Sequence, residues 1–251
     1  MQYTLKKSLG QHFLHDEQIC QKIVDAVQEH PFSQLVEIGP GGGAITKYLV
    51  KLPGVHFKVV EIDDEKVAYL SKTFPALVPN IIHASVLDIA PPFEGNFTLV
   101  GNFPYNISTE IVFKVLEWRE QVDCVVGMFQ KEVAQRLAAK HGSKVYGVTS
   151  VLAQAFYDIH YLFDVGPECF TPPPKVMSGV LRMTPVKQPL EMRSHRHFTI
   201  LVKAAFNQRR KQLRNAVRSL FEDTVLQDEI FNKRAEQLSV ADFAALSFRM
   251  K

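Results

Sequence analysis

The chain has 251 residues, a length that suits one large domain or an ordinary domain with a small companion. With 46% apolar and 22% charged residues, its composition excludes a disordered chain. The net charge of +3 is unevenly spread, because residues 1–185 carry 16 basic and 19 acidic side chains and residues 186–251 carry 13 and 7. This asymmetry fits either a module that faces a polyanion or a solvated helical surface.

Short apolar runs alternate with amphipathic ones over the first 185 residues. We expect helices at 16–29, capped by Asp16, 44–51, 63–74, 108–118, capped by Ser108, 131–140 and 148–156. We expect strands at 35–38, 55–62, 81–82, 97–100, 124–129, 159–165 and 176–183. This alternation predicts an α/β fold with a parallel, doubly wound sheet, and the last two strands could add an antiparallel pair at its edge.

Beyond a linker bracketed by Pro185 and Pro189, the pattern changes to helices only. We expect these at 197–208, at 210–221 and after a cap at Ser239. The sequence therefore predicts two domains, an α/β domain over 1–185 and a small all-α domain over 186–251.

Three scattered cysteines, Cys20, Cys124 and Cys169, form no Cys-x-x-Cys motif, so we expect buried free thiols and no metal site. The first residues lack the apolar stretch of a signal peptide, and no run is long enough to span a membrane. We expect a cytoplasmic protein with no membrane partner.

A glycine turn, Gly39-Pro-Gly41-Gly-Gly43, lies between a predicted strand and a predicted helix. Glu61 ends the next strand, where a carboxylate can accept hydrogen bonds from both hydroxyls of a ribose. Together these features predict a nucleoside cofactor, with Gly39, Gly41, Glu61 and Ile62 as candidate contacts. NAD is one alternative, but Glu37 before the turn would repel a pyrophosphate and suits the cationic methionine part of S-adenosylmethionine.

The tetrapeptide Asn102-Phe-Pro-Tyr105 follows the predicted strand at 97–100, at the sheet edge where such folds bind ligands. The side-chain oxygen of Asn102 and the carbonyl of Pro104 can each accept one hydrogen of an amine conjugated to a purine ring. That arrangement directs the nitrogen lone pair towards an incoming methyl group. Tyr105 offers a face on which the base can stack. The alternative to a substrate site is a purely structural Asn-x-Pro turn with a tyrosine in the core.

Several motifs occur in a specific order along the chain. They are Ser8-Leu-Gly-Gln-His-Phe-Leu14, Glu37-Ile-Gly-Pro-Gly41, Gly101-Asn-Phe-Pro-Tyr-Asn-Ile-Ser-Thr109, Gln130-Lys-Glu-Val-Ala134, Phe170-Thr-Pro-Pro-Pro-Lys-Val176 and Ala205-Phe-Asn-Gln-Arg-Arg-Lys211. In this order the chain resembles the bacterial small-subunit (16S) ribosomal RNA adenine N6,N6-dimethyltransferases, the methyltransferase A or kasugamycin-resistance family.

The resemblance implies a Rossmann-like, S-adenosylmethionine-dependent methyltransferase domain followed by a helical domain. It implies cofactor contacts at His12, Leu14, Gly39, Glu61, Ser85 and Asn102. This chain departs from the common pattern at His12, where the family often has asparagine, and at Ser85, where an aspartate usually binds the adenine amine. Asp88, three residues on, is either a substitute for that aspartate or the cap of a loop. Phe103 replaces a commoner leucine. The resemblance also implies that Phe170, before a stiff proline run, stacks on the target adenine opposite Tyr105; the alternative is a rigid loop at the core edge.

The segment Asn207–Arg218 places Arg210, Arg214 and Arg218 on one stripe of the helix predicted there, flanked by Arg209 and Lys211. These five residues are candidate RNA contacts, and a solvated amphipathic helix is the alternative. Lys6 and Lys7 could add a second contact.

We therefore predict S-adenosylmethionine-dependent dimethylation of two adjacent adenosines near the 3′ end of 16S rRNA in the 30S subunit or its precursor, with a role in subunit biogenesis. We expect a monomer that does not act on DNA. The alternatives are the related large-subunit rRNA dimethyltransferase, a DNA adenine methyltransferase, and an RNA-binding assembly factor in which methylation is secondary.

Overall fold

The computed structural model describes residues 12–251, so Lys6, Lys7 and the first four residues of the Ser8–Leu14 motif lie outside the described part of the chain. The chain divides into two compact units. The sheet unit contains the described residues up to Ala134 and Ile159–Pro185, and the helical unit contains Gln135–Asp158 and Val186–Lys251.

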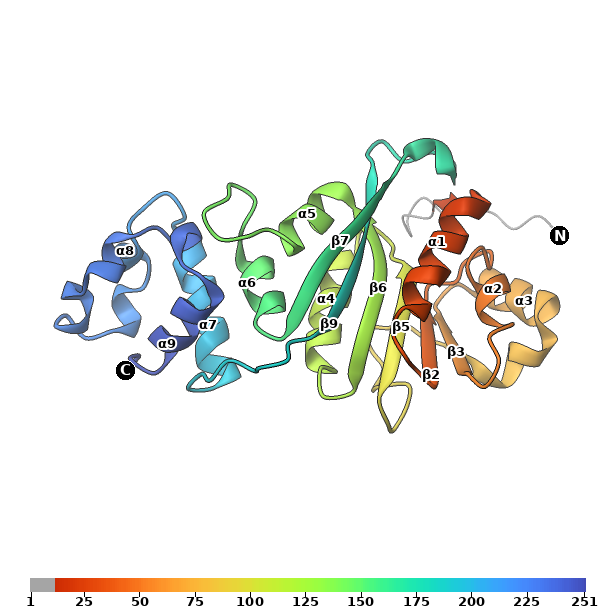
Figure 1. The fold of residues 1–251 in the computed structure, drawn as a ribbon, viewed down its shortest axis with the longest axis horizontal. Coiled ribbons are helices and arrows are strands. Elements are labelled where there is room, and N and C mark those ends of the chain that lie inside the picture. Colours follow the sequence, from red (N-terminus) through yellow and green to blue (C-terminus); the bar gives the residue numbers. More distant parts are fainter. Residues whose placement is uncertain (1–11) are drawn as a thin grey trace. The chain divides into compact units, whose positions relative to one another are not determined.

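The sheet unit is built on a mixed, seven-stranded sheet with the order β4-β3-β2-β5-β6-β9-β7 (Figure 1). Its strands are β2 (Gln34–Ile38), β3 (His56–Glu61), β4 (Ile81–His83), β5 (Phe97–Asn102), β6 (Val122–Gln130), β7 (Tyr157–Val165) and β9 (Ser178–Pro185). Strands β2 to β6 pair in parallel, whereas β9 pairs antiparallel with β6. The predicted doubly wound sheet with a reversed edge is confirmed. A separate two-stranded sheet, which the sequence analysis missed, joins β1 (Phe13–Leu14) to β8 (Phe170–Thr171).

The helices of this unit precede, connect or follow the parallel strands. They are α1 (Glu17–Gln28), α2 (Thr46–Leu49), α3 (Asp64–Thr73), α4 (Ser108–Glu117) and α5 (Lys131–Leu137), which continues into the helical unit. Asp16 caps α1 as predicted, by accepting from the amides of Gln18 and Ile19. The predicted cap at Ser108 is wrong: Ile107 holds the cap position, and the Ser108 hydroxyl donates instead to the carbonyl of Tyr105.

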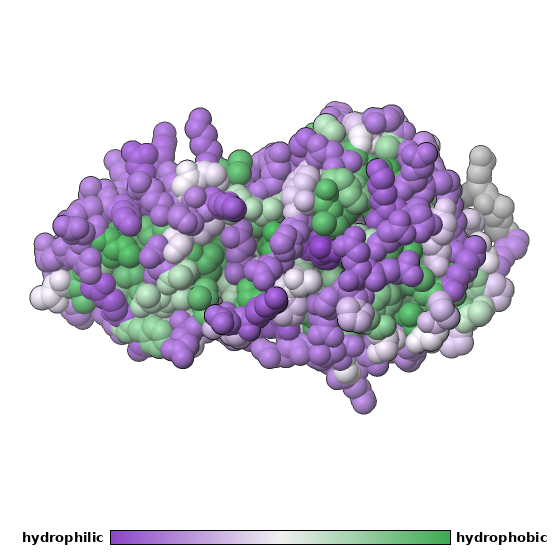
Figure 2. Space-filling view, in the orientation of Figure 1, coloured by the Kyte–Doolittle hydropathy of each residue, from purple (hydrophilic) through white to green (hydrophobic). Residues whose placement is uncertain are grey.

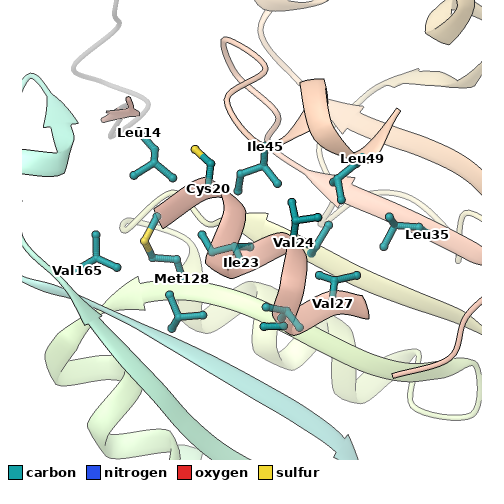
Figure 3. Close-up of a cluster of buried hydrophobic side chains, with 14 of the residues drawn as sticks. Leu14, Cys20, Ile23, Val24, Val27, Leu35, Ile45, Leu49, Met128 and Val165 are labelled. Atoms are coloured by element: carbon teal, nitrogen blue, oxygen red, sulfur yellow. The ribbon is translucent and has the colours of Figure 1, made fainter. Parts of the chain in front are cut away.

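Helix α1 supplies one layer of the core that supports the sheet (Figure 3). Its residues Ile23, Val24 and Val27 are at most 2% exposed and cluster with Leu35 of β2 and Met128 of β6. Burying each such side chain stabilises the fold by about 1.5–3 kcal/mol. In Figure 1, α1 passes in front of the central strands and α4 behind them, so helices cover both faces of the sheet.

The helical unit packs short helices around a separate aromatic and aliphatic core. It contains α6 (Val148–Gln154), α7 (His195–Asn207), α8 (Leu213–Ala216) and α9 (Val240–Ser247), with short 3-10 turns between α8 and α9. Ser239 caps α9 as predicted. Residues 135–158, which the sequence analysis assigned to the first domain, belong here because α6 packs on α7 and α9.

The predicted helix at 210–221 is wrong. Gln212 is extended, with φ −61° and ψ 147°, and the Leu213 amide donates to the carbonyl of Lys233 at 2.8 Å. The chain then forms only the short α8 and a 3-10 turn at Arg218–Leu220. The extended Gln212 and the bond from Leu213 to Lys233 interrupt the chain inside the predicted helix, so tertiary contacts override the helical spacing of the arginines.

Candidate active site

A cavity of about 240 Å³ opens at the carboxyl ends of β2, β3 and β5. It lies where the strand order reverses, because β3 flanks β2 on one side and β5 on the other. All eight predicted cofactor contacts line it: His12, Leu14, Gly39, Gly41, Glu61, Ile62, Ser85 and Asn102. The structure therefore brings together in one cavity residues that span about 90 positions of the sequence.

The glycine turn forms the cavity wall after β2. Gly39 and Gly41 have φ angles of 67° and 53°, in the left-handed region that favours glycine. The Gly39 amide donates to the Val60 carbonyl at 2.9 Å, which ties the turn to β3. A side chain at either glycine would strain the turn that shapes the cavity.

Glu61 is a buried carboxylate that the backbone holds in place. Its Oε1 accepts from the amides of Ile62 and Asp63 at 2.9 and 3.0 Å, and its Oε2 accepts from Gly41 at 3.1 Å. Only 6% of the residue is exposed. The carboxylate is thus oriented before any ligand arrives, and its remaining lone pairs can accept from hydroxyl groups.

Glu37 lies beneath the glycine turn and is 2% exposed. Burial, opposed by a hydrogen bond of 2.6 Å that the Thr46 hydroxyl donates to Oε2 and assisted by the nearby charge of Glu61, raises the pKa of its carboxyl to about 8. At pH 7 the side chain is therefore mostly in its neutral form. A cation bound in the cavity would favour the charged form.

The rim beside β3 and β4 suits a flat ring. Ile62 is 55% exposed although it lines the cavity, and the buried Val86 faces the same space. The Ser85 hydroxyl accepts from the Leu87 amide at 3.2 Å, which leaves its O–H free to donate. The exposed Asp88 does not line the cavity, so the structure does not support it as a substitute for the aspartate that Ser85 replaces.

Asn102 ends β5 with its amide group oriented by a neighbour. Its Nδ2 donates to the carbonyl oxygen of His12 at 3.2 Å. Because a carbonyl can only accept, this bond fixes which end of the amide carries the donor and turns Oδ1 to other partners. Asn102 therefore keeps an acceptor at the cavity, and its contact with a target amine stays a prediction.

Pro104 and Tyr105 follow at the same edge. The Pro104 carbonyl accepts from the Ile107 amide at 3.1 Å and retains a second lone pair. The Tyr105 hydroxyl shares a hydrogen bond of 2.5 Å with Ser178, and burial raises the pKa of Tyr105. The tyrosine ring is thereby held at the cavity mouth in its neutral form.

His12 connects three parts of the site. Its carbonyl accepts from Asn102, its Nδ1 lies 2.8 Å from the carbonyl of Pro172, and its ring lies 5.4 Å from that of Tyr105 at 33°. Since the Pro172 oxygen can only accept, Nδ1 carries the hydrogen. An asparagine at this position could not reproduce the ring contact, so this departure from the family pattern adds an aromatic surface to the site.

Phe170 does not lie where the resemblance placed it. It is 2% exposed, belongs to the core cluster, and is absent from the cavity wall. The cause is the pairing of β8 with β1, which sets Phe170 opposite Leu14 and turns its ring inward. The stacking role stays a prediction.

Phe103, the other departure, fills a space left by glycines. A Cβ built on Gly127 would lie 2.3 Å from the Phe103 ring, and one on Gly101 would lie 2.8 Å from it. The ring also meets Phe129 edge to face at 5.1 Å. Phe103 therefore anchors the backbone between Asn102 and Pro104.

Sequence reasoning missed several residues that line the cavity. Buried Lys66 comes from α3, and Leu87 and Ile107 come from loops. The sequence carries no signal for them, because each reads as part of an ordinary helix or loop and only the fold brings it to the cavity.

The five predicted RNA contacts lie in the helical unit but share no helix. Arg209 and Arg214 are half-buried and bonded within the protein, Arg209 to the carbonyls of Ser143 and Lys144 and Arg214 to Asn232. Arg210, Lys211 and Arg218 are exposed. The predicted stripe is wrong, and only part of its charge faces solvent.

The three thiols are free and buried, as predicted. Among residues 12–251, no group of three or more His, Cys, Asp or Glu side chains could hold a metal ion. Within the same residues, no helix combines the length and the apolar character needed to cross a bilayer.

These residues fit S-adenosylmethionine. The oriented carboxylate of Glu61 suits ribose hydroxyls, exposed Ile62 suits an adenine face, and the turn with Glu37 beneath it suits a cationic amino-acid moiety. The cavity leads from there to Asn102.

Comparisons with known proteins agree with this geometry. A family model described as "Ribosomal RNA adenine dimethylase" matches residues 2–250. Ribosomal RNA small subunit methyltransferase A of Cytophaga hutchinsonii is 54% identical over 96% of this chain and 95% of its own length. The protein of the same name from Flavobacterium johnsoniae is 48% identical over 98% of this chain and 95% of its own length.

Two solved structures share the fold. A dimethyladenosine transferase from Plasmodium falciparum has a TM-score of 0.76 at 23% identity and covers 92% of this chain and 94% of its own. The structure of the 23S rRNA methyltransferase ErmE has a TM-score of 0.70 at 22% identity. The match covers 93% of this chain and 99% of the ErmE chain. At this level of identity they establish the α/β methyltransferase fold with its C-terminal helices.

Proposed function

Since the chain belongs to the ribosomal RNA adenine dimethylase family, we propose that it dimethylates the N6 amines of two adjacent adenosines near the 3′ end of 16S rRNA. Its cofactor is S-adenosylmethionine. The small subunit is favoured over the large one because relatives 44–54% identical over nearly the whole chain are named small subunit methyltransferases, whereas ErmE is 22% identical.

The orientation of the Asn102 amide is the observation that carries this proposal. The bond from Nδ2 to the His12 carbonyl leaves Oδ1 as an acceptor at the edge of the cofactor cavity. An exocyclic adenine amine is a weak nucleophile because its lone pair is delocalised into the ring. A site for methylating it needs acceptors that hold its hydrogens, and Asn102 provides one.

When bound, S-adenosylmethionine supplies an electrophilic methyl group on its sulfonium. Glu61 holds the ribose through its remaining lone pairs, and Ile62 contacts the adenine ring of the cofactor. Glu37 and the Gly39–Gly43 turn hold the cationic amino-acid end.

Asn102 Oδ1 and the Pro104 carbonyl each accept one hydrogen of the target amine. The nitrogen then becomes pyramidal, and its lone pair points towards the cofactor side of the cavity. Once the nitrogen has gained a methyl group it is cationic and its proton is acidic, so no strong general base is required.

The target base stacks on Tyr105, whose ring Ser178 and His12 hold at the cavity mouth. Stacking on Phe170 as well requires its ring to move out of the core, where it is 2% exposed. The base-binding side of the site is therefore assembled when RNA binds.

The helical unit binds the RNA backbone. It carries 16 basic and 8 acidic residues, a net charge of +8, against 13 basic and 18 acidic residues in the rest of the chain. We propose that the protein acts as a monomer on the 30S subunit or its precursor, in the cytoplasm where subunits assemble, and not on DNA.

The test is mass spectrometry of rRNA incubated with the protein and labelled S-adenosylmethionine. Undermethylated 30S particles should gain dimethyladenosine at two adjacent positions, and naked 23S rRNA should not. A Glu61→Gln variant serves as the control for contaminating activity. Methylation of 23S rRNA alone, or of neither RNA, would overturn the proposal.

A further inference from the structure

The loop between α5 and α6 carries cations that no motif accounts for. Lys140, His141 and Lys144 are all exposed in this loop, which we call the basic loop and define as residues 140–145. The sequence analysis placed it in the first domain, but the structure assigns it to the helical unit. It therefore belongs to the same compact body as Arg210 and Lys211.

Arg209 ties the basic loop to the segment that follows α7. Its guanidinium donates to the carbonyls of Ser143 and Lys144, and its Nε lies 3.5 Å from Oε2 of Glu236. The Gly142 amide donates to the Glu236 carbonyl at 2.6 Å, which adds a second tie. The guanidinium group of Arg209 therefore interacts with acceptors inside the protein.

An aromatic cluster fixes the end of the loop. Tyr146, 1% exposed, lies edge to face with Phe206 of α7 at 6.1 Å, and Phe206 lies 6.0 Å from Phe243 of α9. The basic loop is therefore held at both its middle and its end. Its lysine side chains remain in solvent while its backbone is fixed.

This arrangement gathers four exposed cations from two distant segments: Lys140, Lys144, Arg210 and Lys211. Within residues 12–251 none of the four forms an ion pair with an acidic side chain, whereas Arg209 faces Glu236. Hydrophilic side chains project from the upper edge of the helical unit in Figure 2.

We propose that Lys140 and Lys144 of the basic loop form one phosphate-binding surface with Arg210 and Lys211, and that Arg209 is a positioning residue that holds the loop. The partner is the backbone of the RNA substrate, so the proposal rests on the proposed function. RNA helices are recognised largely by shape and phosphate contacts, which a rigid group of cations provides. Because the loop is already fixed, less ordering entropy is lost on binding.

The first test measures binding of small-subunit RNA by fluorescence anisotropy over a series of salt concentrations, without cofactor. Lys140→Gln/Lys144→Gln should weaken binding about tenfold and lower the slope of log K against log salt by about 1 for each lysine. Lys187→Gln is the matched control, because Lys187 is an exposed lysine of the same unit outside this surface. If the double variant binds like Lys187→Gln, the surface is wrong.

The second test is a double-mutant cycle between Arg209 and Lys144. Arg209→Lys keeps the charge but cannot bridge two carbonyls and a carboxylate, so it should weaken binding about as much as Lys144→Gln. Adding Lys144→Gln to Arg209→Lys should then change little, because the loop is already released. Additive losses, or wild-type binding by Arg209→Lys, would overturn the positioning role.

Circular dichroism and thermal unfolding of each variant show whether the helical unit still folds. The binding results also distinguish a failure of the proposed function from a failure of the proposed phosphate-binding surface. If the wild-type chain binds no small-subunit RNA, the proposed function fails. If it binds and the lysine variants bind equally well, only this inference fails.

Discussion

The sheet unit and the helical unit use polar side chains in different ways. At the cavity, Glu61 and Asn102 are bonded to the backbone and keep free lone pairs that face a ligand. In the helical unit, Arg209 and Arg214 donate hydrogen bonds to acceptors inside the protein. The side chains of Arg210 and Arg218 are exposed. The proposed function thus assigns chemistry and RNA attraction to separate sets of residues, and it should be possible to remove either one alone.

The sharpest separation is expected from Asn102→Ala. It removes the oriented acceptor, so methyl transfer should fall by about 10²–10³-fold, the typical cost of losing one placed dipole. RNA affinity should stay within about twofold, because backbone contacts supply most of the binding. Single-turnover methylation and anisotropy measure the two quantities.

Asn96→Ala is the control for this change, since Asn96 precedes β5 at the opposite edge of the sheet and bonds to Asp123. It should leave both quantities near wild type. A comparable loss of RNA binding in Asn102→Ala would break the comparison between the units.

The next largest effect is expected from Gly127→Ala in β6. The new methyl group would lie 2.3 Å from the Phe103 ring, so the ring must shift and pull on the adjacent Asn102. Such overpacking lowers the free energy of unfolding by about 1–3 kcal/mol, which thermal unfolding should show as a lower Tm. Methylation should also fall, while RNA affinity should stay unchanged. Phe103→Leu in the same chain should recover part of both losses, because leucine is smaller; no recovery would mean that the ring is not the cause.

The two units also differ in how well the sequence predicts them. Parallel strands such as β2 and β5 are short, mainly apolar runs between turn residues, so their positions follow from the pattern alone. The glycine turn and Glu61 follow as well, because both come at strand ends. The helix expected at 210–221 was wrong, since arginine spacing carries no information on whether Leu213 and Phe221 are buried by residues far along the chain.

Pairings between distant segments were equally beyond sequence reasoning. Neither two-residue strand, β1 nor β8, has a periodic signal, yet their pairing puts Phe170 in the core. Likewise, Lys66 and the basic loop acquire their surroundings only through the fold.

A smaller difference in RNA binding and stability should distinguish Arg214 from Arg218, two arginines that were predicted to share one helix face. Arg218→Gln should weaken RNA binding two- to fivefold and lower the salt slope by about 1, because its side chain is exposed. Arg214→Gln should change the slope little but destabilise the helical unit by about 1 kcal/mol, since it loses the bond to Asn232. Salt titrations and thermal unfolding of both variants test this, and the reverse assignment would show that Arg214, not Arg218, meets RNA.

The smallest expected effect concerns a single proton on Glu37. With a pKa of about 8 against an ordinary value of 4.5, this carboxyl is mostly protonated at pH 7 in the free protein. A cationic cofactor lowers that pKa, so binding should release most of one proton at pH 7, and affinity should rise between pH 6 and 8. Calorimetry in buffers of different ionisation enthalpy measures the proton.

Stability provides an independent check on Glu37. Because its folded pKa is raised, the stability it contributes is complete below about pH 4.5 and is lost as pH rises through about 8. Glu37→Gln mimics the neutral form, so it should abolish proton release and flatten the fall in Tm over this window. Retention of both signals in Glu37→Gln would assign the proton to another group and remove Glu37 from the cationic end of the cavity. RNA affinity should not change in either case, which keeps even this weakest effect confined to the sheet unit.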